Sequence, residues 1–281
     1  MAELDAAAFG ATLGRAFSEN GIGGMLSSDR ARVLTAMTER LLSENEKYNL
    51  TALTEPGKIA LLHYADCALI AGYMKKGATV IDVGCGAGFP TLPLAVLRPD
   101  LRLLAVDSTE KKVAYVRETA HLFGLDNVTC LTARAEDLAA DGTYRENFDY
   151  ATARAVTEMR ALSELLLPFV KIGGEMIAMK GKNAAYEAAG AKRALAILGG
   201  EVVSIDETPL RSAAYGEQSH AVIRVAKRKK TPAAYPRAWA QISKKPLCTD
   251  KRSEIAPFFV TSWGGLLTGA RACDIILKIN W

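Results

Sequence analysis

The chain has 281 residues, a net charge of +4 at pH 7, 49% hydrophobic residues and 23% charged ones, an ordinary globular composition that excludes a disordered chain and a disulfide-rich scaffold. Its five cysteines are scattered without a CxxC pair, so we expect a reducing compartment and no metal site. The N-terminus has no signal-peptide pattern and no apolar run approaches the roughly 18 to 20 residues of a membrane span, so we expect a cytoplasmic protein without a membrane partner.

Residues 1–74 are predicted to form an N-terminal helical subdomain. Ser27 or Ser28 can cap a helix in which apolar residues recur at three- and four-residue steps. After the turn at Glu55-Pro56-Gly57, a further helix is expected from about Lys58 to Tyr73. The apolar face of the first of these helices must pack on another part of the protein.

Residues 75–226 are predicted to form an α/β domain. Seven short apolar runs have the texture of strands: Thr79–Val83, Leu101–Val106, Val128–Leu131, Phe148–Thr152, Glu175–Met179, Val202–Ile205 and Ala221–Val225. Helical patterns separate most of them, which implies a mainly parallel, Rossmann-like sheet with helices on both faces. The last two runs lie too close together for a crossover helix, so we expect an antiparallel final pair.

The first predicted strand leads directly into a glycine loop, Gly84-x-Gly86-x-Gly88, followed by a helix near Pro90. Glycines allow the backbone to approach a ligand closely, and the helix N-terminus offers free N–H groups. A dinucleotide-binding loop would have the spacing GxGxxG. The GxGxG spacing, with Asp82 two residues before it, favours S-adenosylmethionine, which has no pyrophosphate and carries positive charge.

Acidic residues follow the next two strands. Asp107, with Ser108 and Thr109, is predicted to bind the cofactor ribose, although these residues can instead cap the following helix. Ala135 and Glu136 follow the third strand, where the edge of an adenine would lie. The alternative for Glu136 is that of an acidic residue in the first turn of a short helix.

Arg154 follows the fourth strand, where the methyl group and its acceptor should meet, but by position alone a surface ion pair explains it equally well. The sequence there, Ala153-Arg154-Ala155, lacks the Asn-Pro-Pro-aromatic or Asp-Pro-Pro-aromatic element of amino-directed nucleic-acid methyltransferases. No cysteine lies nearby to attack a cytosine ring. We therefore expect no covalent catalysis.

Ordered motifs across residues 35–247 resemble the glucose-inhibited division protein B family, the bacterial 16S rRNA methyltransferases RsmG, which methylate guanine N7. They are Lys47-Tyr48-Asn49-Leu50-Thr51-Ala52, His63-Tyr64-x-Asp66, Asp82 to Pro90, Asp107-Ser108, Arg134-Ala135-Glu136, Ala153-Arg154-Ala155, Met179-Lys180-Gly181 and Lys244-Lys245-Pro246-Leu247. The chain departs from the family at Cys67, usually serine, and at Thr91, often glycine.

The resemblance implies S-adenosylmethionine contacts at Gly84, Phe89, Asp107 to Thr109, Ala135, Glu136 and Arg154, and a target in the decoding-region loop of small-subunit rRNA. Guanine N7 has a free lone pair, so no general base is required. The catalytic candidates besides Arg154 are His63, Asp66 and Lys180. His63 and Asp66 share a helix face and either line the acceptor pocket or tie the helices to the sheet. Lys180 either donates to guanine O6 or a phosphate, or has a structural role.

The segment 227–247, here called the basic segment, contains no acidic residue. It is predicted to bind 16S rRNA or the small ribosomal subunit through Lys227, Arg228, Lys229, Lys230, Arg237, Lys244 and Lys245. A solvated linker is the alternative. Residues 248–281 have no clean periodicity, and we assign them no structure. We expect a monomer, and the competing functions are methylation of another acceptor, non-catalytic RNA binding and nicotinamide-dependent oxidation.

Overall fold

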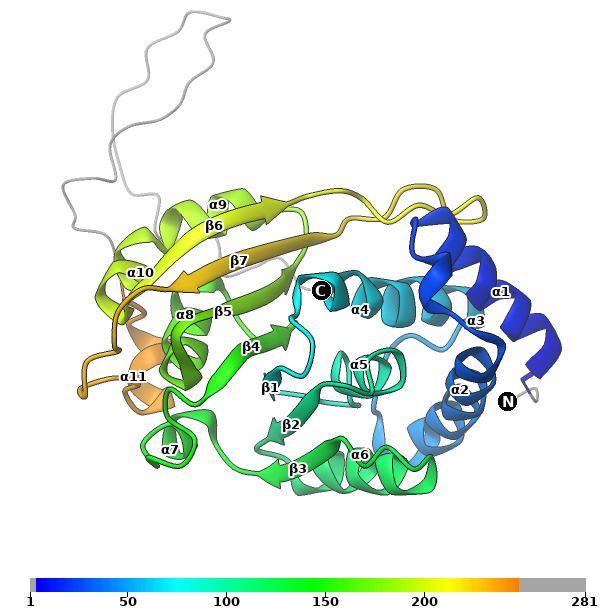
Figure 1. Cartoon of the computed structure of the whole chain (residues 1–281), viewed down its shortest axis with the longest axis horizontal. Helices are drawn as coiled ribbons and strands as arrows, with labels where there is room; N and C mark the ends of the chain where they lie inside the picture. Colours follow the sequence, from blue (N-terminus) through cyan, green and yellow to red (C-terminus); the bar gives the residue numbers. More distant parts are fainter. Residues whose placement is uncertain (1–3, 248–281) are drawn as a thin grey trace, which may run out of the picture. The chain divides into compact units, whose positions relative to one another are not determined.

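The computed structural model describes residues 4–247 and has a sheet of seven strands between two sets of helices (Figure 1). The strands are β1 Thr79–Val83, β2 Arg102–Asp107, β3 Val128–Thr132, β4 Phe148–Arg154, β5 Val170–Lys180, β6 Gly200–Asp206 and β7 Ala221–Lys227. Their order is β3-β2-β1-β4-β5-β7-β6, and β7 is the one strand of this sheet that runs in the opposite direction to the others. The predicted α/β class and the antiparallel final pair are confirmed.

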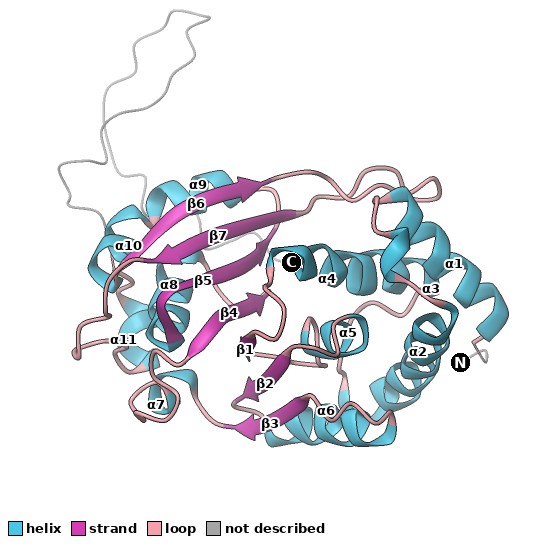
Figure 2. Ribbon diagram, viewed as in Figure 1, coloured by secondary structure: helices cyan, strands magenta, loops and turns pink. Residues whose placement is uncertain are grey.

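Helices cover both faces of this sheet (Figure 2). One face carries α5 Thr91–Leu97 and α6 Glu110–Leu122, and the other carries α7 Ala135–Leu138, α8 Met159–Leu166, α9 Ala184–Gly190 and α10 Lys192–Leu198. Alternation along each strand divides the apolar side chains between two cores. In β1 and β2, Val80 and Leu103 belong to one core, while Ile81 and Leu104 belong to the other.

The N-terminal helices pack on the first of these cores. They are α1 Ala6–Glu19, α2 Ser28–Tyr48, and a continuous helical stretch made of α3 Pro56–Ile59, the π-helical turn η2 Ala60–Ala65, α4 Asp66–Leu69 and the 3₁₀ turn η3 Ile70–Tyr73. Ser27 caps α2 by accepting from the Arg30 N–H, as the sequence predicts. Inside, the hydroxyls of Thr38 and Tyr64 are 2.9 Å apart and join α2 to η2. Whether residues 1–74 form a separate domain stays a prediction.

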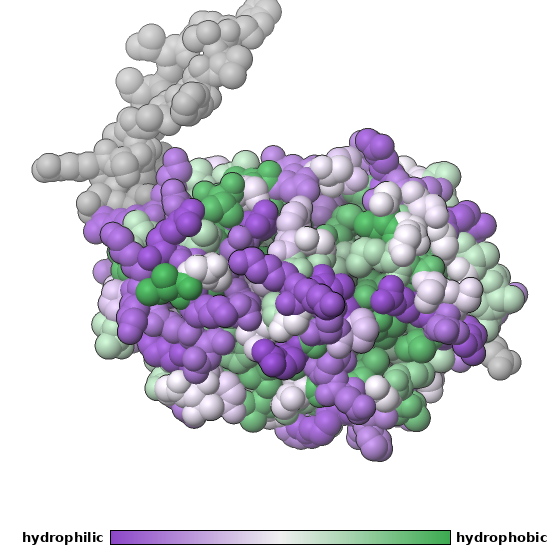
Figure 3. Space-filling model, viewed as in Figure 1, coloured by the Kyte–Doolittle hydropathy of each residue, from purple (hydrophilic) through white to green (hydrophobic). Residues whose placement is uncertain are grey.

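The basic segment ends in α11 Trp239–Lys244, which packs on α8. Two further 3₁₀ turns are η1 Gly23–Met25 and η4 Leu167–Phe169. Among residues 4–247, no helix is long and apolar enough to cross a membrane. On the face shown in Figure 3, hydrophilic residues cover much of the surface and hydrophobic residues form separate small patches. The stretch 248–281 lies outside the described residues.

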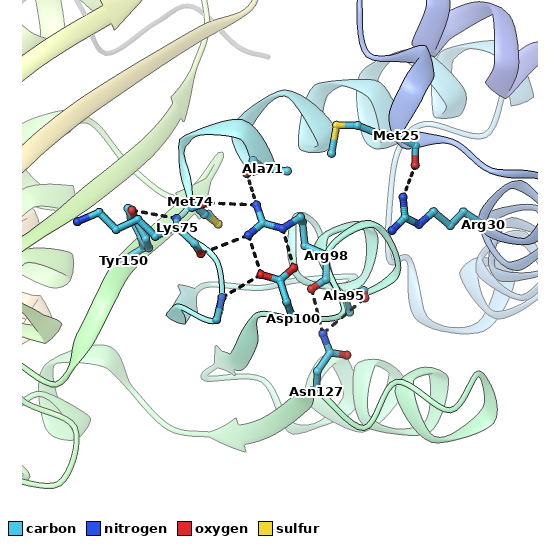
Figure 4. A network of polar contacts seen from close by, with 11 residues as sticks. Met25, Arg30, Ala71, Met74, Lys75, Ala95, Arg98, Asp100, Asn127 and Tyr150 are labelled. Carbon is cyan, nitrogen blue, oxygen red and sulfur yellow. Dashed lines mark hydrogen bonds and ion pairs between the residues drawn. The ribbon is translucent and has the colours of Figure 1, made fainter.

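Arg98 joins the end of the N-terminal helices to the start of the sheet (Figure 4). Its guanidinium donates to the carbonyls of Ala71 at 2.7 Å, Met74 at 3.1 Å and Lys75 at 3.2 Å. It also binds both carboxylate oxygens of Asp100, each at 2.8 Å. Since these carbonyls end the helix before β1, Arg98 fixes how that helix meets the strand.

Replacing Arg98 with lysine tests this link. A lysine ammonium cannot reproduce the planar fork that binds a carboxylate and several carbonyls at once, so Arg98→Lys should lower the free energy of unfolding by about 1 to 3 kcal/mol. Arg102→Lys, at an exposed position of β2, is the matched control and should change it by less than about 0.5 kcal/mol. Urea unfolding measures both, and equal effects would contradict the assignment.

Candidate functional site

A pocket of ≈ 310 Å³ lies at the carboxyl ends of β1, β2, β3 and β4. This edge of an open parallel sheet is where ligands usually bind. The pocket brings together five of the predicted cofactor residues, Gly84, Asp107, Ser108, Ala135 and Glu136. A larger groove of ≈ 550 Å³, lined by α2, α5 and the end of α6, contains none of the predicted site residues.

Asp107 organises the loops of this pocket. Its Oδ2 accepts from the Gly86 N–H at 3.1 Å and its Oδ1 accepts from the Thr109 N–H at 2.9 Å. Helix α6 begins only at Glu110, so Asp107 is not its N-cap. The carboxylate therefore ties the glycine loop after β1 to the loop after β2, and it still has free lone pairs for hydroxyl donors.

The glycine loop leaves room for a ligand at Gly86. This residue has φ +55°, and an added Cβ would approach no side chain, the nearest atom being the Gly84 carbonyl oxygen at 3.9 Å. At Gly84 and Gly88, by contrast, a Cβ would lie 2.7 Å from Val156 and 2.5 Å from Leu92. The backbone at Gly86 is thus open, whereas Gly84 allows Val156 to approach at the pocket and Gly88 allows close packing against the buried Leu92.

Asp82 lies buried beneath the loop. Its Oδ2 accepts from the Thr91 hydroxyl at 2.6 Å, while its Oδ1 has no hydrogen-bond partner among the described residues. Burial raises the pKa of Asp82 to about 6, against the hydrogen bonds from Thr91. Thr91, where the sequence departs from the family pattern, is thus the side chain that pairs with this carboxyl. A cationic ligand group near the loop would favour the ionised carboxylate.

Arg154, at the end of β4, is held from three directions. One Nη donates to the Leu62 carbonyl at 2.9 Å and lies 3.4 Å from Asp66 Oδ2, and the other donates to His63 Nδ1 at 3.0 Å. The guanidinium also lies 5.1 Å from the Phe89 ring centroid, against which the His63 ring is stacked at 4.2 Å. Arg154 does form an ion pair with Asp66, but both side chains are mostly buried, at 18% and 15% exposed, so the pair does not lie on the open surface. It joins the sheet, the glycine loop and the π-helical turn η2. Short π-helical turns are often found at functional sites.

His63 is neutral in this arrangement. The guanidinium can only donate, so Nδ1 accepts, and the proton lies on Nε2, which donates to the Thr51 hydroxyl at 3.0 Å. Burial, reinforced by the charge of Arg154, lowers the pKa of His63 to about 3. At neutral pH this imidazole is a poor general base.

Asp66 and Lys180 are also engaged within the protein. Asp66 Oδ1 lies 2.6 Å from His220 Nδ1, next to β7. Lys180 donates to the Thr157 carbonyl at 2.6 Å and to Glu187 at 2.7 Å, and so holds the loop after β4. The structure thus contains the structural contacts foreseen as alternatives for His63, Asp66 and Lys180, and a contact with an acceptor stays a prediction.

The prediction that Lys227 binds RNA is wrong, and Arg237, whose side chain is 24% exposed, is held by an ion pair within the protein. The Lys227 side chain is fully buried and donates to the Leu167 carbonyl at 2.7 Å, and burial lowers its pKa to about 8. The Arg237 guanidinium binds both oxygens of the buried Glu164, at 2.8 and 2.6 Å. Both charges are used inside the fold. Five exposed members of the set stay predictions: Arg228, Lys229, Lys230, Lys244 and Lys245.

Trp239 is a pocket residue that sequence reasoning did not place. It lines the pocket at the carboxyl ends of β1 to β4, and its backbone N–H donates to Glu136 Oε1 at 3.3 Å. In the sequence it is one of several aromatic residues suited to stacking on a base, and nothing in its spacing links it to Glu136. No group of three or more metal-ligating side chains occurs in residues 4–247.

The family model for GidB, rRNA small subunit methyltransferase G, matches residues 30–213, which include the helical turn of His63, the glycine loop and Arg154. The chain belongs to this family. It is similar to proteins named ribosomal RNA small subunit methyltransferase G from Clostridium perfringens and Leuconostoc mesenteroides. The first is 40% identical over 80% of this chain and 94% of its own length, and the second 42% identical over 79% and 93%. The resemblance predicted from the motifs is confirmed.

The raised pKa of Asp82 predicts how stability depends on pH. Since folding favours the protonated carboxyl, ionisation costs stability as the pH rises from about 4 to about 7, by up to about 3 kcal/mol for the rise from 3.8 to about 6. The neutral variant Asp82→Asn escapes this cost. It should match the wild type near pH 4 and gain on it towards pH 7. Urea unfolding across this range is the measurement, and a constant difference would sink the explanation.

Proposed function

We propose that this protein transfers a methyl group from S-adenosylmethionine to N7 of a guanine in the decoding-region loop of 16S rRNA, in the cytoplasm. Family membership and the names of its relatives support the reaction and its RNA substrate. The observation that carries the choice of acceptor is the neutral, hydrogen-bonded His63 beside Arg154. Because His63 is a poor base, the site suits an acceptor atom that carries no proton to be removed, as guanine N7 does.

The residues of the pocket fit this cofactor. The Asp107 carboxylate would accept from the ribose hydroxyls, and Ala135 and Glu136 would meet the adenine edge. Beside the pocket, the open backbone at Gly86, which is bonded to Asp107, would lie against the amino-acid part. Bound S-adenosylmethionine would supply an electrophilic methyl group attached to its sulfonium sulfur. The negative charge of Asp82, once ionised, complements that cation.

Catalysis in this proposal comes from position and charge. Arg154 is fixed by the carbonyl of Leu62 and by His63, so the end of β4 stays rigid where donor and acceptor meet. Asp66, 15% exposed and bonded to His220, adds negative charge to this cluster and would stabilise a guanine that becomes cationic as N7 is methylated. None of these residues needs to gain or lose a proton.

The assignment can be tested in cells and with purified components. Nuclease digestion and mass spectrometry of 16S rRNA should show N7-methylguanine in the decoding-region loop only when the gene is present. Purified protein should transfer the methyl group to rRNA or small subunits. If the methyl group is transferred only to a protein or a small molecule, the proposed rRNA acceptor is wrong. If the protein binds cofactor and RNA without any transfer, it is a non-catalytic RNA-binding protein.

The exposed lysines of the basic segment predict salt-dependent RNA binding. Reversing Lys229 and Lys230 to glutamate should weaken binding to a 16S rRNA fragment and reduce the slope of log K against log salt by about 1 to 2. Lys76→Glu is the control, because Lys76 is equally exposed but lies outside the basic segment, near the start of β1. Filter binding at several salt concentrations measures the slope, and an unchanged slope would remove these lysines from the interface.

A further inference from the structure

The basic segment is fixed to the body of the protein. The Arg145 guanidinium donates to the carbonyls of Thr231 and Tyr235, both at 2.9 Å. Further along, Arg237 binds Glu164 of α8 through its side chain and also through its backbone N–H, at 2.9 Å. Glu164 is fully buried, so losing Arg237 would leave a buried charge without its partner. These contacts determine where α11 begins.

The two large apolar residues of helix α11 have different surroundings. Ile242 is fully buried and anchors the helix in the core shared with α8. Trp239, one turn earlier, is only partly buried and lines the cofactor pocket, where Glu136 lies on the opposite chain segment. Ile242 and Arg237 anchor the helix, and Trp239 packs against the edge of the same core while it also lines the pocket.

We propose that Trp239 is a cofactor-contacting residue that closes the adenosine end of the pocket. The inference rests on the proposed use of S-adenosylmethionine. Its support is that Trp239 lines the pocket together with Glu136, where the adenine edge would lie, because a flat aromatic ring presents a large surface to another flat ring. The backbone N–H of Trp239 also donates to one carboxylate oxygen of Glu136, which leaves the other oxygen to accept from a ligand. The basic segment thus completes a site built mainly by β1 to β4.

Binding of S-adenosylhomocysteine to the full-length chain tests the proposal without any methyl transfer. Calorimetry should give about tenfold weaker binding for Trp239→Ala, the loss expected for one aromatic stacking partner, and near wild-type binding for Trp239→Phe. Gln241→Ala, at an exposed position of the same helix, is the matched control and should bind like the wild type. Thermal unfolding without ligand checks that each variant is folded.

Fluorescence gives a second readout that a purely structural role would not move. The chain has three tryptophans, and replacing Trp263 and Trp281 with phenylalanine leaves Trp239 as the reporter. Its emission should change on titration with S-adenosylhomocysteine, with the dissociation constant found by calorimetry. Wild-type affinity in Trp239→Ala, or unchanged emission during binding, would overturn the inference alone. If the wild type does not bind S-adenosylhomocysteine, both the proposed cofactor and the role of Trp239 are overturned. If it binds the ligand but does not methylate rRNA, the proposed function is overturned and the role of Trp239 is kept.

Discussion

The guanidinium of Arg154 is the contact on which the site depends. It joins three parts of the chain that are far apart in sequence: β4, the π-helical turn of Leu62 and His63, and the glycine loop through Phe89. Each part has its own reason to fold, but none fixes the position of the others. Because an arginine cannot lose its charge in a protein, it can only donate, and this forces His63 to be a neutral acceptor. One residue thereby fixes both the geometry and the protonation of the cluster.

Three aspartates near the glycine loop have different roles because their surroundings differ. Asp107 is bonded to two backbone N–H groups and orders the loops at the pocket. Asp82, one strand away, is buried with one oxygen unpaired, so its charge is costly until a cation approaches. Asp66 lies between Arg154 and His220 and carries charge toward the end of β4. A reaction without proton transfer needs such fixed charges more than it needs a titrating base.

Much of the fold follows from local pattern, whereas the charged contacts of the basic segment do not. Short apolar runs between helical patterns located every strand, and the glycine spacing identified the loop at Gly86, since both depend on near neighbours in sequence. Lys227 was misplaced because the predicted strand ended at Val225; β7 continues to Lys227, so this lysine follows Ile223 and Val225 onto the buried face. Arg237 could not be predicted, because its partner Glu164 lies 73 residues away and only the fold brings them together.

The buried Lys227 and the ion pair of Arg237 with the buried Glu164 change how the basic segment can meet RNA. Swinging it away as a flexible arm would expose Ile242, leave Glu164 buried without Arg237, and remove Trp239 from the pocket wall. Breaking a buried ion pair on one side costs about 3 to 5 kcal/mol, which is more than a few surface phosphate contacts return. The segment should therefore stay docked, and RNA should meet Lys229, Lys230, Lys244 and Lys245 as a fixed surface. A fixed surface holds the target base in register with the pocket, which is what catalysis by positioning requires.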